Sequence, residues 1–239
     1  MGYGETFSLR ELTASEKSKF LGRTYGWMAV ALLISAASAF FTTQSPALLK
    51  LIFGHGIIGC LVLAVAEFVL VYWLTSRIQK MSLTTAIIGF IGYSILNGLT
   101  LSSILLIYKI TSIATAFFST AIVFGVMSFY GAKTSRDLTS WGHYLFMVLT
   151  GVIIASAVNI LISFLTKSNI RWLDIVISIV SIILFTAFTA YDTQKILRLA
   201  ENSNGNDDYK KVSIIAALDL YLDFINILIS FLRIFGKRK

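Results

Sequence analysis

Carboxylates set in long apolar stretches are the residues of this 239-residue chain best suited to do chemistry. Asp219 and Asp223 stand four residues apart in AALDLYLDFINILISFLRIFG, a spacing that places both on one face of a helix. Asn226 follows three residues later on nearly the same face, and Asp192 ends another apolar stretch in FTAYDTQKI. Since ionisable groups are costly in lipid, we predict that the last helix turns this face inward, toward protein or water.

Glu67 is a separate candidate because it stands alone in an apolar stretch. Residues 61–66 and 68–74 carry no charge, and Glu67 lies about 15 Å along a helix from Arg77, at roughly 1.5 Å of rise per residue. This places Glu67 near the middle of a membrane, where an ionised group costs roughly 2.5 to 3.5 kcal/mol. Asp174, three residues after Arg171, is instead expected to be an exposed residue at a helix end.

Such clusters of oxygen atoms suit two kinds of chemistry. Hard cations such as Ca²⁺ take six to eight oxygen ligands in flexible geometry. Neighbouring carboxylates also repel each other when both are ionised, so the site would respond to protons. The sequence thus indicates a site for calcium and protons; the alternative is a set of buried polar contacts with Arg77, Lys195 or Arg233 that transports nothing.

The elements that must position these residues are membrane helices. Hydrophobic residues make up 56% of the chain and charged residues 13%, about half the share usual in soluble domains. Uncharged runs of 26, 28, 23 and 29 residues cover 24–49, 81–108, 110–132 and 138–166, and about 20 apolar residues suffice for a helix to cross a bilayer. We predict an all-α integral membrane protein with seven transmembrane helices, near 24–43, 56–74, 83–107, 112–131, 143–165, 172–192 and 212–234.

The domain organisation follows from these segments. Residues 1–23 form a polar segment without the apolar centre of a cleaved signal peptide, residues 24–235 form the seven-helix domain, and residues 236–239 form a basic tail. The last helix, with its acidic face, is expected at the centre of the bundle, enclosed by the other six. The net charge of +8 is spread over segment ends, which favours a lipid bilayer rather than nucleic acid as the partner.

Charges near the segment ends predict a cytoplasmic N-terminus. Seven crossings would then place the C-terminus outside, but the basic tail favours the inside, where a re-entrant seventh segment would keep it. The side of the C-terminus is therefore open. Twelve Lys and Arg residues lie on the side of the N-terminus and four on the other, namely Arg10, Lys17, Lys19, Arg23, Arg77, Lys80, Lys133, Arg136, Lys195, Arg198, Lys210 and Lys211 against Lys50, Lys109, Lys167 and Arg171.

Several longer motifs make the sequence recognisable. These are TYGWMAVALLISA, SRIQKMS, NGLTLSSI, SFYGAKTSRDLTSWG, AYDTQKI and LYLDFINILISFLRIFG, spread over nearly the whole chain. With them the sequence resembles the Bax inhibitor family, also called the transmembrane Bax-inhibitor-motif family, in its bacterial inner-membrane branch. The resemblance implies a cell-membrane protein with two layers of three helices around the seventh.

The resemblance also implies a function and its residues. Family members are described as pH-sensitive calcium leak channels controlled by two aspartates, which match Asp192 and Asp223. An arginine after the second helix, here Arg77, can pair with the first aspartate, and Glu67 resembles an acid that many members carry. The implied calcium ligands are Asp192, Asp223 and Glu67, and Ca²⁺ is the transported ion rather than a cofactor. Asp219 departs from the family pattern as an additional carboxylate.

Two rival functions are open at this stage. A regulator of stress or cell death that binds other membrane proteins, without transporting ions, fits the resemblance almost as well. An intramembrane aspartyl protease also needs two aspartates, but no glycine precedes Asp223 as its GxGD motif requires, and no Pro-Ala-Leu motif follows. His55 and His143 have no nearby ligand to complete a zinc site. We therefore do not expect an enzyme.

Overall fold

The computed structural model describes residues 13–54, 56–166, 170–201 and 206–239. Within these ranges, seven helices are long and apolar enough to cross a membrane, which confirms the predicted fold class. Arg10 and Lys167, used above for the orientation, lie outside the described residues. The helices are α1 (Ala14–Gln44), α2 (Pro46–Phe53), α3 (Ile57–Arg77), α4 (Leu83–Ile107), α5 (Ile110–Lys133), α6 (Gly142–Thr166), α7 (Arg171–Glu201) and α8 (Asn206–Phe235), with single 3₁₀ turns η1 (Ile78–Lys80) and η2 (Thr139–Trp141).

The first helix begins earlier than the hydropathy predicts. Thr13 caps α1 by accepting a hydrogen bond from the Glu16 backbone, and the Glu16 carboxylate accepts one from the Thr13 backbone. This reciprocal pair satisfies two backbone donors that a helix start leaves free. Residues 14–23, expected in a separate polar segment, therefore belong to α1. The short α2 was not expected either, and it starts where Ser45 caps a turn that opens with Pro46.

The last two spanning helices are also longer than predicted. α7 continues past Asp192 to Glu201, and α8 begins at Asn206 rather than near Val212. Asp192 therefore lies within α7 and is followed on the same helix by Gln194, Lys195 and Arg198. The extended ends bring polar side chains of α7 alongside the first half of α8.

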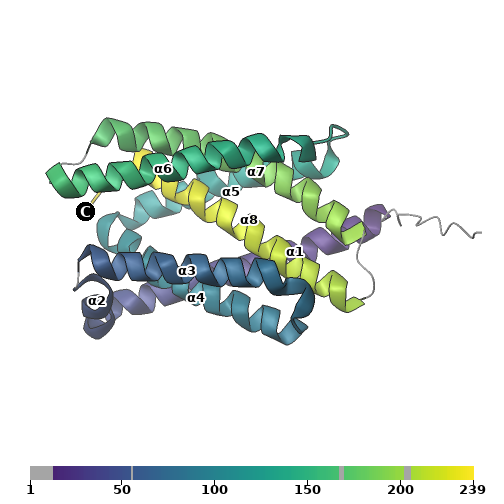
Figure 1. Ribbon diagram of the computed structural model, residues 1–239, viewed down its shortest axis with the longest axis horizontal. Coiled ribbons are helices and arrows are strands. Elements are labelled where there is room, and N and C mark those ends of the chain that lie inside the picture. Colours follow the sequence, from purple (N-terminus) through teal and green to yellow (C-terminus); the bar gives the residue numbers. More distant parts are fainter. Residues whose placement is uncertain (1–12, 55, 167–169, 202–205) are drawn as a thin grey trace, which may run out of the picture.

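The helices form two groups on either side of α8. In Figure 1, α8 runs diagonally between a group containing α1, α3 and α4 and a group containing α5, α6 and α7. The most extensive contacts are between α7 and α8 and between α1 and α4, and α8 also packs against α1, α5 and α4. α3 packs chiefly on α4, and α6 on α7. Complete enclosure of α8 by all six other helices stays a prediction.

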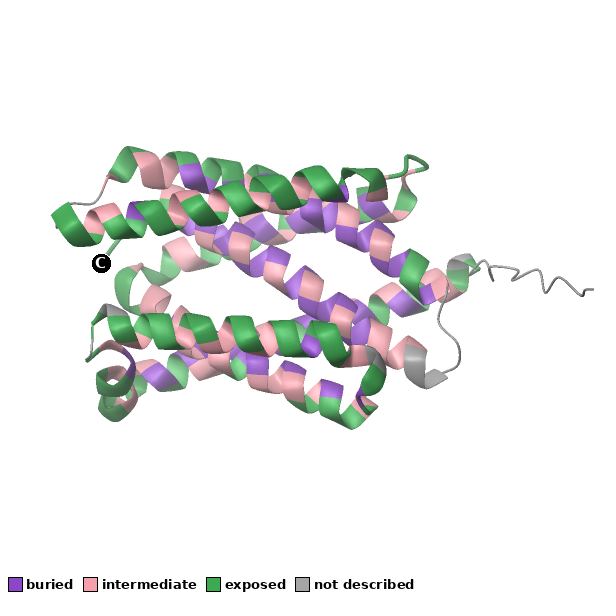
Figure 2. Cartoon of the chain, in the orientation of Figure 1, coloured by how far each residue is buried: buried purple, intermediate pink, exposed green. Residues whose placement is uncertain are grey.

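Burial is concentrated in α8. Of the most apolar 18 residues of each spanning helix, 67% are buried in α8, against 39% in α7 and 6% in α3. Figure 2 shows the buried residues concentrated along α8. Outward-facing side chains such as Phe68 and Ile183 are apolar and exposed, as expected of surfaces that meet lipid. The acidic helix is thus the least exposed of the seven.

Two glycines allow neighbouring helices to approach closely. A Cβ at Gly98 of α4 would lie 2.5 Å from the Ser35 carbonyl oxygen of α1, and a Cβ at Gly131 of α5 would lie 2.2 Å from the Ala190 carbonyl oxygen of α7. Small residues at such crossings are characteristic of helix packing in membranes. These contacts set the spacing of α1 against α4 and of α5 against α7.

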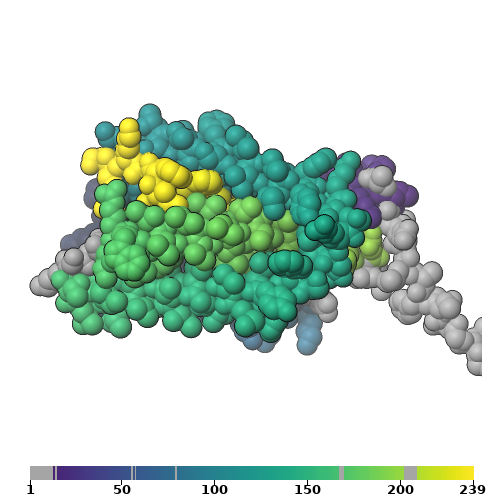
Figure 3. Space-filling view, turned by 90° about the horizontal axis from the view of Figure 1, so that it is seen from above, coloured from purple at the N-terminus to yellow at the C-terminus, as the bar shows by residue number. Residues whose placement is uncertain are grey.

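The end of the chain is fixed at one end of the bundle. The Lys237 backbone donates a hydrogen bond to Ser112, and the Lys109 backbone donates one to the Lys237 carbonyl. α8 crosses the whole bundle, so its end lies opposite the start of α1 (Figures 1 and 3). Within the described residues the seventh segment is one continuous helix, long and apolar enough to cross a membrane. A cytoplasmic N-terminus stays a prediction.

Candidate functional site

A lysine joins the acidic residues of α7 and α8. The Lys195 ammonium lies 3.4 Å from Asp192 Oδ1, one turn earlier on α7, and 3.3 Å from Asp219 Oδ2 on α8. Asp192 is 7% exposed, and the side chain of Lys195 is 36% exposed. The bridge thus links the two helices with the most extensive contact.

Asp223 completes the cluster, with the Thr189 side chain of α7 within hydrogen-bonding reach of its carboxylate. It is 3% exposed, and its Oδ2 atom is buried with no hydrogen-bond partner among the described residues. Asp223 is close enough to Asp192, Asp219 and Lys195 for their charges to interact. The cluster therefore sets three carboxylates against one ammonium, an imbalance that a bound proton or cation would relieve.

A chain of hydrogen bonds runs from α8 to Glu67. Tyr221 stands between the two aspartates of α8 in the sequence; its hydroxyl donates to Asn97 Oδ1 at 2.8 Å, and Asn97 Nδ2 donates to Glu67 Oε2 at 3.4 Å. Thr100 donates to the other Glu67 oxygen at 2.6 Å, and Ser35 of α1 is 2.7 Å from the Tyr221 hydroxyl. Tyr221 is fully buried. These bonds connect α1, α3, α4 and α8 through polar atoms in an otherwise apolar interior.

The candidate calcium ligands do not form one ligand set in this structure. Glu67 is bonded to α4, whereas Asp192 and Asp223 lie between α7 and α8. In the described part of the chain, no three acidic, histidine or cysteine side chains gather closely enough to hold a metal ion. A calcium ion bound by all three residues would need a different arrangement of the helices.

Neither Arg77 nor Asn226 bonds to an aspartate in the part of the chain that the structure describes. Arg77 is exposed at the end of α3, and within the described ranges it forms no ion pair. Lys195 occupies the position next to Asp192 that the family resemblance gives to an arginine. Asn226 donates its amide hydrogen to the Leu222 carbonyl of its own helix. Asp174, expected to be exposed, is half-buried and accepts a hydrogen bond from Asn159 of α6 at 2.5 Å.

The helix that carries Asp192 is held by the α5–α6 connection. The Gln194 side chain accepts a hydrogen bond from the Leu138 backbone and donates one to the Arg136 carbonyl, both at 2.8 Å. One turn later, Arg198 is 2.9 Å from Asp137 and donates to Thr139 at 2.9 Å. These contacts explain the polar side chains that follow Asp192 and fix the end of α7.

Asp137 provides a pH-dependent test of this attachment. Hydrogen bonds from the Thr139 hydroxyl and backbone, and then the Arg198 guanidinium, hold the pKa of Asp137 below its usual value. Since the pKa is lower in the folded state, the ionised carboxylate stabilises the fold above the unfolded pKa, and this stabilisation is lost as pH falls through the folded pKa.

We expect Asp137→Asn to lower the melting temperature of the detergent-solubilised protein equally at pH 6, 7 and 8. The difference from wild type should shrink below about pH 4, near the ordinary pKa of an aspartate. Melting curves at matched ionic strength measure this. A difference that changes between pH 6 and 8 would contradict the expectation and would make Asp137 a candidate pH sensor.

Fold and site together define a seven-span helical membrane protein with a buried acidic cluster on its last two helices. The sequence matches the family described as "Inhibitor of apoptosis-promoting Bax1" over residues 17–239. The chain belongs to this Bax inhibitor family.

Relatives that are 37 to 42% identical come from several bacteria. The inner membrane protein YbhL of Escherichia coli strain K12 is 42% identical over 224 residues, which cover 92% of each chain. An uncharacterized protein of Borreliella burgdorferi is 40% identical over 93% of this chain and 94% of its own. The uncharacterized protein RP147 of Rickettsia prowazekii is 37% identical over 96% of this chain and 98% of its own. These matches extend across the membrane domain.

Proposed function

We propose that the protein is a pH-sensitive calcium leak channel of the cell membrane, in which Asp192 and Asp223 control the passage of ions. The observation that carries the proposal is the cluster of three carboxylates and one ammonium between α7 and α8, with a buried Asp223 oxygen that lacks a partner. Carboxylates inside membrane helices are costly and usually mark pathways for ions or protons, and Ca²⁺ prefers oxygen ligands.

The proposed mechanism is a two-state gate between α7 and α8. In the closed state, Lys195 bridges Asp192 and Asp219, and α8 blocks the path. Protons set the number of ionised carboxylates, so a change of pH alters the ion pairs that hold the two helices together. In the open state the aspartates separate from Lys195, and Ca²⁺ moves past them down its gradient.

Glu67 and Arg77 have supporting roles in this proposal. The hydrogen bonds from Tyr221 through Asn97 to Glu67 join α8 to α3 through polar atoms, on a face of α8 other than the one that carries the aspartates. Arg77 is free to pair with Asp192 in another state of the gate, in which Lys195 has been displaced. The location we propose is the bacterial inner membrane, as the name of the Escherichia coli relative indicates, with the N-terminus in the cytoplasm.

Calcium uptake into liposomes that contain the purified full chain tests the proposed function. Uptake above that of empty liposomes, varying between pH 6 and 8, is the expected result. The folded state of the reconstituted protein is checked by its circular dichroism spectrum. Folded protein that transports no calcium at any pH would contradict the proposal and would favour a regulator that acts by binding other membrane proteins.

A further inference from the structure

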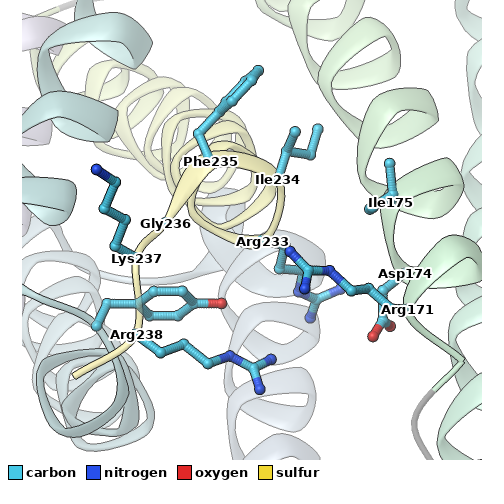
Figure 4. Close-up of a pocket in the computed structure, with 10 residues that line it drawn as sticks. Arg171, Asp174, Ile175, Arg233, Ile234, Phe235, Gly236, Lys237 and Arg238 are labelled. Carbon is cyan, nitrogen blue, oxygen red and sulfur yellow. The ribbon is translucent and has the colours of Figure 1, made fainter.

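A basic cavity lies at the end of the bundle opposite the start of α1. Its volume is about 770 Å³, and it is formed by the first turn of α7, the last turn of α8 and the chain that follows α8 (Figure 4). In Figure 3 the yellow end of α8 reaches the surface at this end of the molecule. The residues that line the cavity are Tyr108, Arg171, Asp174, Ile175, Arg233, Ile234, Phe235, Gly236, Lys237 and Arg238.

Positive charge dominates the cavity. Its lining has four cationic side chains, Arg171, Arg233, Lys237 and Arg238, and one carboxylate, Asp174. Among the described residues, none of the four cations forms an ion pair, and one Asp174 oxygen already accepts a hydrogen bond from Asn159. The lining therefore sets four cations against one carboxylate, and positive charge predominates.

Two arginines are arranged to act together. In Figure 4 the side chains of Arg171 and Arg233 extend from α7 and α8 toward each other. Like charges that face each other are unfavourable unless an anion lies between or beside them. A planar guanidinium donates paired hydrogen bonds to the oxygens of a phosphate, which suits two arginines to one phosphate group.

The position of the cavity favours a lipid as the source of the phosphate. α7 starts at Arg171 and α8 ends at Phe235, so the arginines lie where spanning helices leave the bilayer. Ile175, Ile234 and Phe235 add apolar surface to the same lining, and Phe235 is 70% exposed. Basic pockets between membrane helices bind anionic lipid headgroups, most often on the cytoplasmic side. With a cytoplasmic N-terminus, this cavity would take a lipid of the opposite leaflet.

We propose that this cavity binds the phosphate headgroup of an anionic phospholipid, with Arg171 and Arg233 as the principal contacts, Arg238 as a third contact, and the acyl chains against the apolar residues at the end of α8. The bound lipid would connect the ends of α7 and α8, the two helices that carry the acidic cluster. The inference depends on the fold and on this cavity, and it is independent of calcium transport.

Native mass spectrometry of the full chain in a neutral detergent tests the proposal. The protein is titrated with phosphatidylglycerol, with phosphatidylcholine, or with inorganic phosphate, and melting curves are recorded for each. We expect wild type to bind one phosphatidylglycerol at least about tenfold more tightly than the Arg171→Gln/Arg233→Gln variant, the factor that about 1.4 kcal/mol of binding energy gives. Phosphatidylcholine should bind wild type and variant alike.

Two further variants keep the test decisive. Lys19→Gln/Lys50→Gln removes two exposed cations outside the cavity and should bind phosphatidylglycerol as wild type does. Arg238→Gln alters a side chain beyond the last helix, so its weaker lipid binding can be measured even if the double variant fails to fold.

Equal phosphatidylglycerol binding by wild type and by Arg238→Gln, or by wild type and the folded double variant, would overturn the proposal. Stabilisation of the protein by inorganic phosphate as strong as that by phosphatidylglycerol would also overturn it, because the cavity would then be a site for a free anion.

Discussion

Replacing Lys195 with glutamine is expected to raise calcium flux through the reconstituted protein about tenfold at neutral pH, which corresponds to a barrier lower by about 1.4 kcal/mol. Lys195 is the cation that lies 3.4 Å from Asp192 and 3.3 Å from Asp219. Its removal breaks the ion pairs between α7 and α8 and also removes a positive charge that repels Ca²⁺ from the carboxylates. Both effects favour passage of the ion.

Controls for Lys195 separate its charge from its shape. Lys195→Arg keeps the charge and should leave flux closer to wild type than Lys195→Gln does. Lys133→Gln removes a cation that lies over the Phe129 ring and has no contact with the aspartates, and it should change nothing. Calcium uptake by a fluorescent indicator inside the liposomes measures all three. Wild-type flux in Lys195→Gln, with the protein folded, would contradict the proposed closed state.

Gly131→Ala is expected to destabilise the fold strongly. The added Cβ would lie 2.2 Å from the Ala190 carbonyl oxygen, and backbone atoms cannot move aside as the end of a side chain can. α5 and α7 must therefore separate near Asp192, and we expect a loss of about 3 kcal/mol, at the upper end for overpacking. Unfolding of the protein in mixed micelles by increasing amounts of sodium dodecyl sulfate measures the change.

Gly125→Ala on the same helix is the matched control. No atom outside its own helix turn lies within 4 Å of a Cβ at Gly125, so alanine fits there. Its effect should be neutral or slightly stabilising, since alanine favours a helix by about 1 kcal/mol over glycine. Equal stability of the Gly131→Ala and Gly125→Ala variants would contradict the close contact of α5 with α7.

Hydropathy could predict where helices cross the membrane but not where they end. The predicted range 83–107 matches α4, Leu83–Ile107, at both ends. Here the apolar stretch and the helix end together, because the polar residue Ser82 caps the start and the charged residue Lys109 follows the end. α7 continues two and a half turns beyond the apolar stretch, to Glu201, since a helix does not stop where the membrane does. Its polar end is stabilised by Gln194 and Arg198, and hydropathy carries no information on such contacts.

The acidic face of α8 could be predicted from spacing alone, whereas its partners could not. Asp219 and Asp223 recur at helical spacing within one segment, so sequence order reveals their shared face. The choice between Lys195 and Arg77 as the partner of Asp192 depends on how α3, α7 and α8 pack. The hydrogen bonds from Tyr221 to Asn97 and from Asn97 to Glu67 also depend on how the helices pack. The one sequence feature that could have pointed to them is a tyrosine between two aspartates of an apolar helix.

The most direct test of the account compares calcium uptake by wild type and Asp223→Asn at pH 6, 7 and 8. The control is Asp137→Asn, which makes the same change at an exposed aspartate outside the membrane. The account predicts wild-type flux that varies with pH, an unchanged pH profile in Asp137→Asn, and flux in Asp223→Asn that is reduced and no longer varies. Asp223→Asn protein with the same pH-dependent flux as wild type would contradict it.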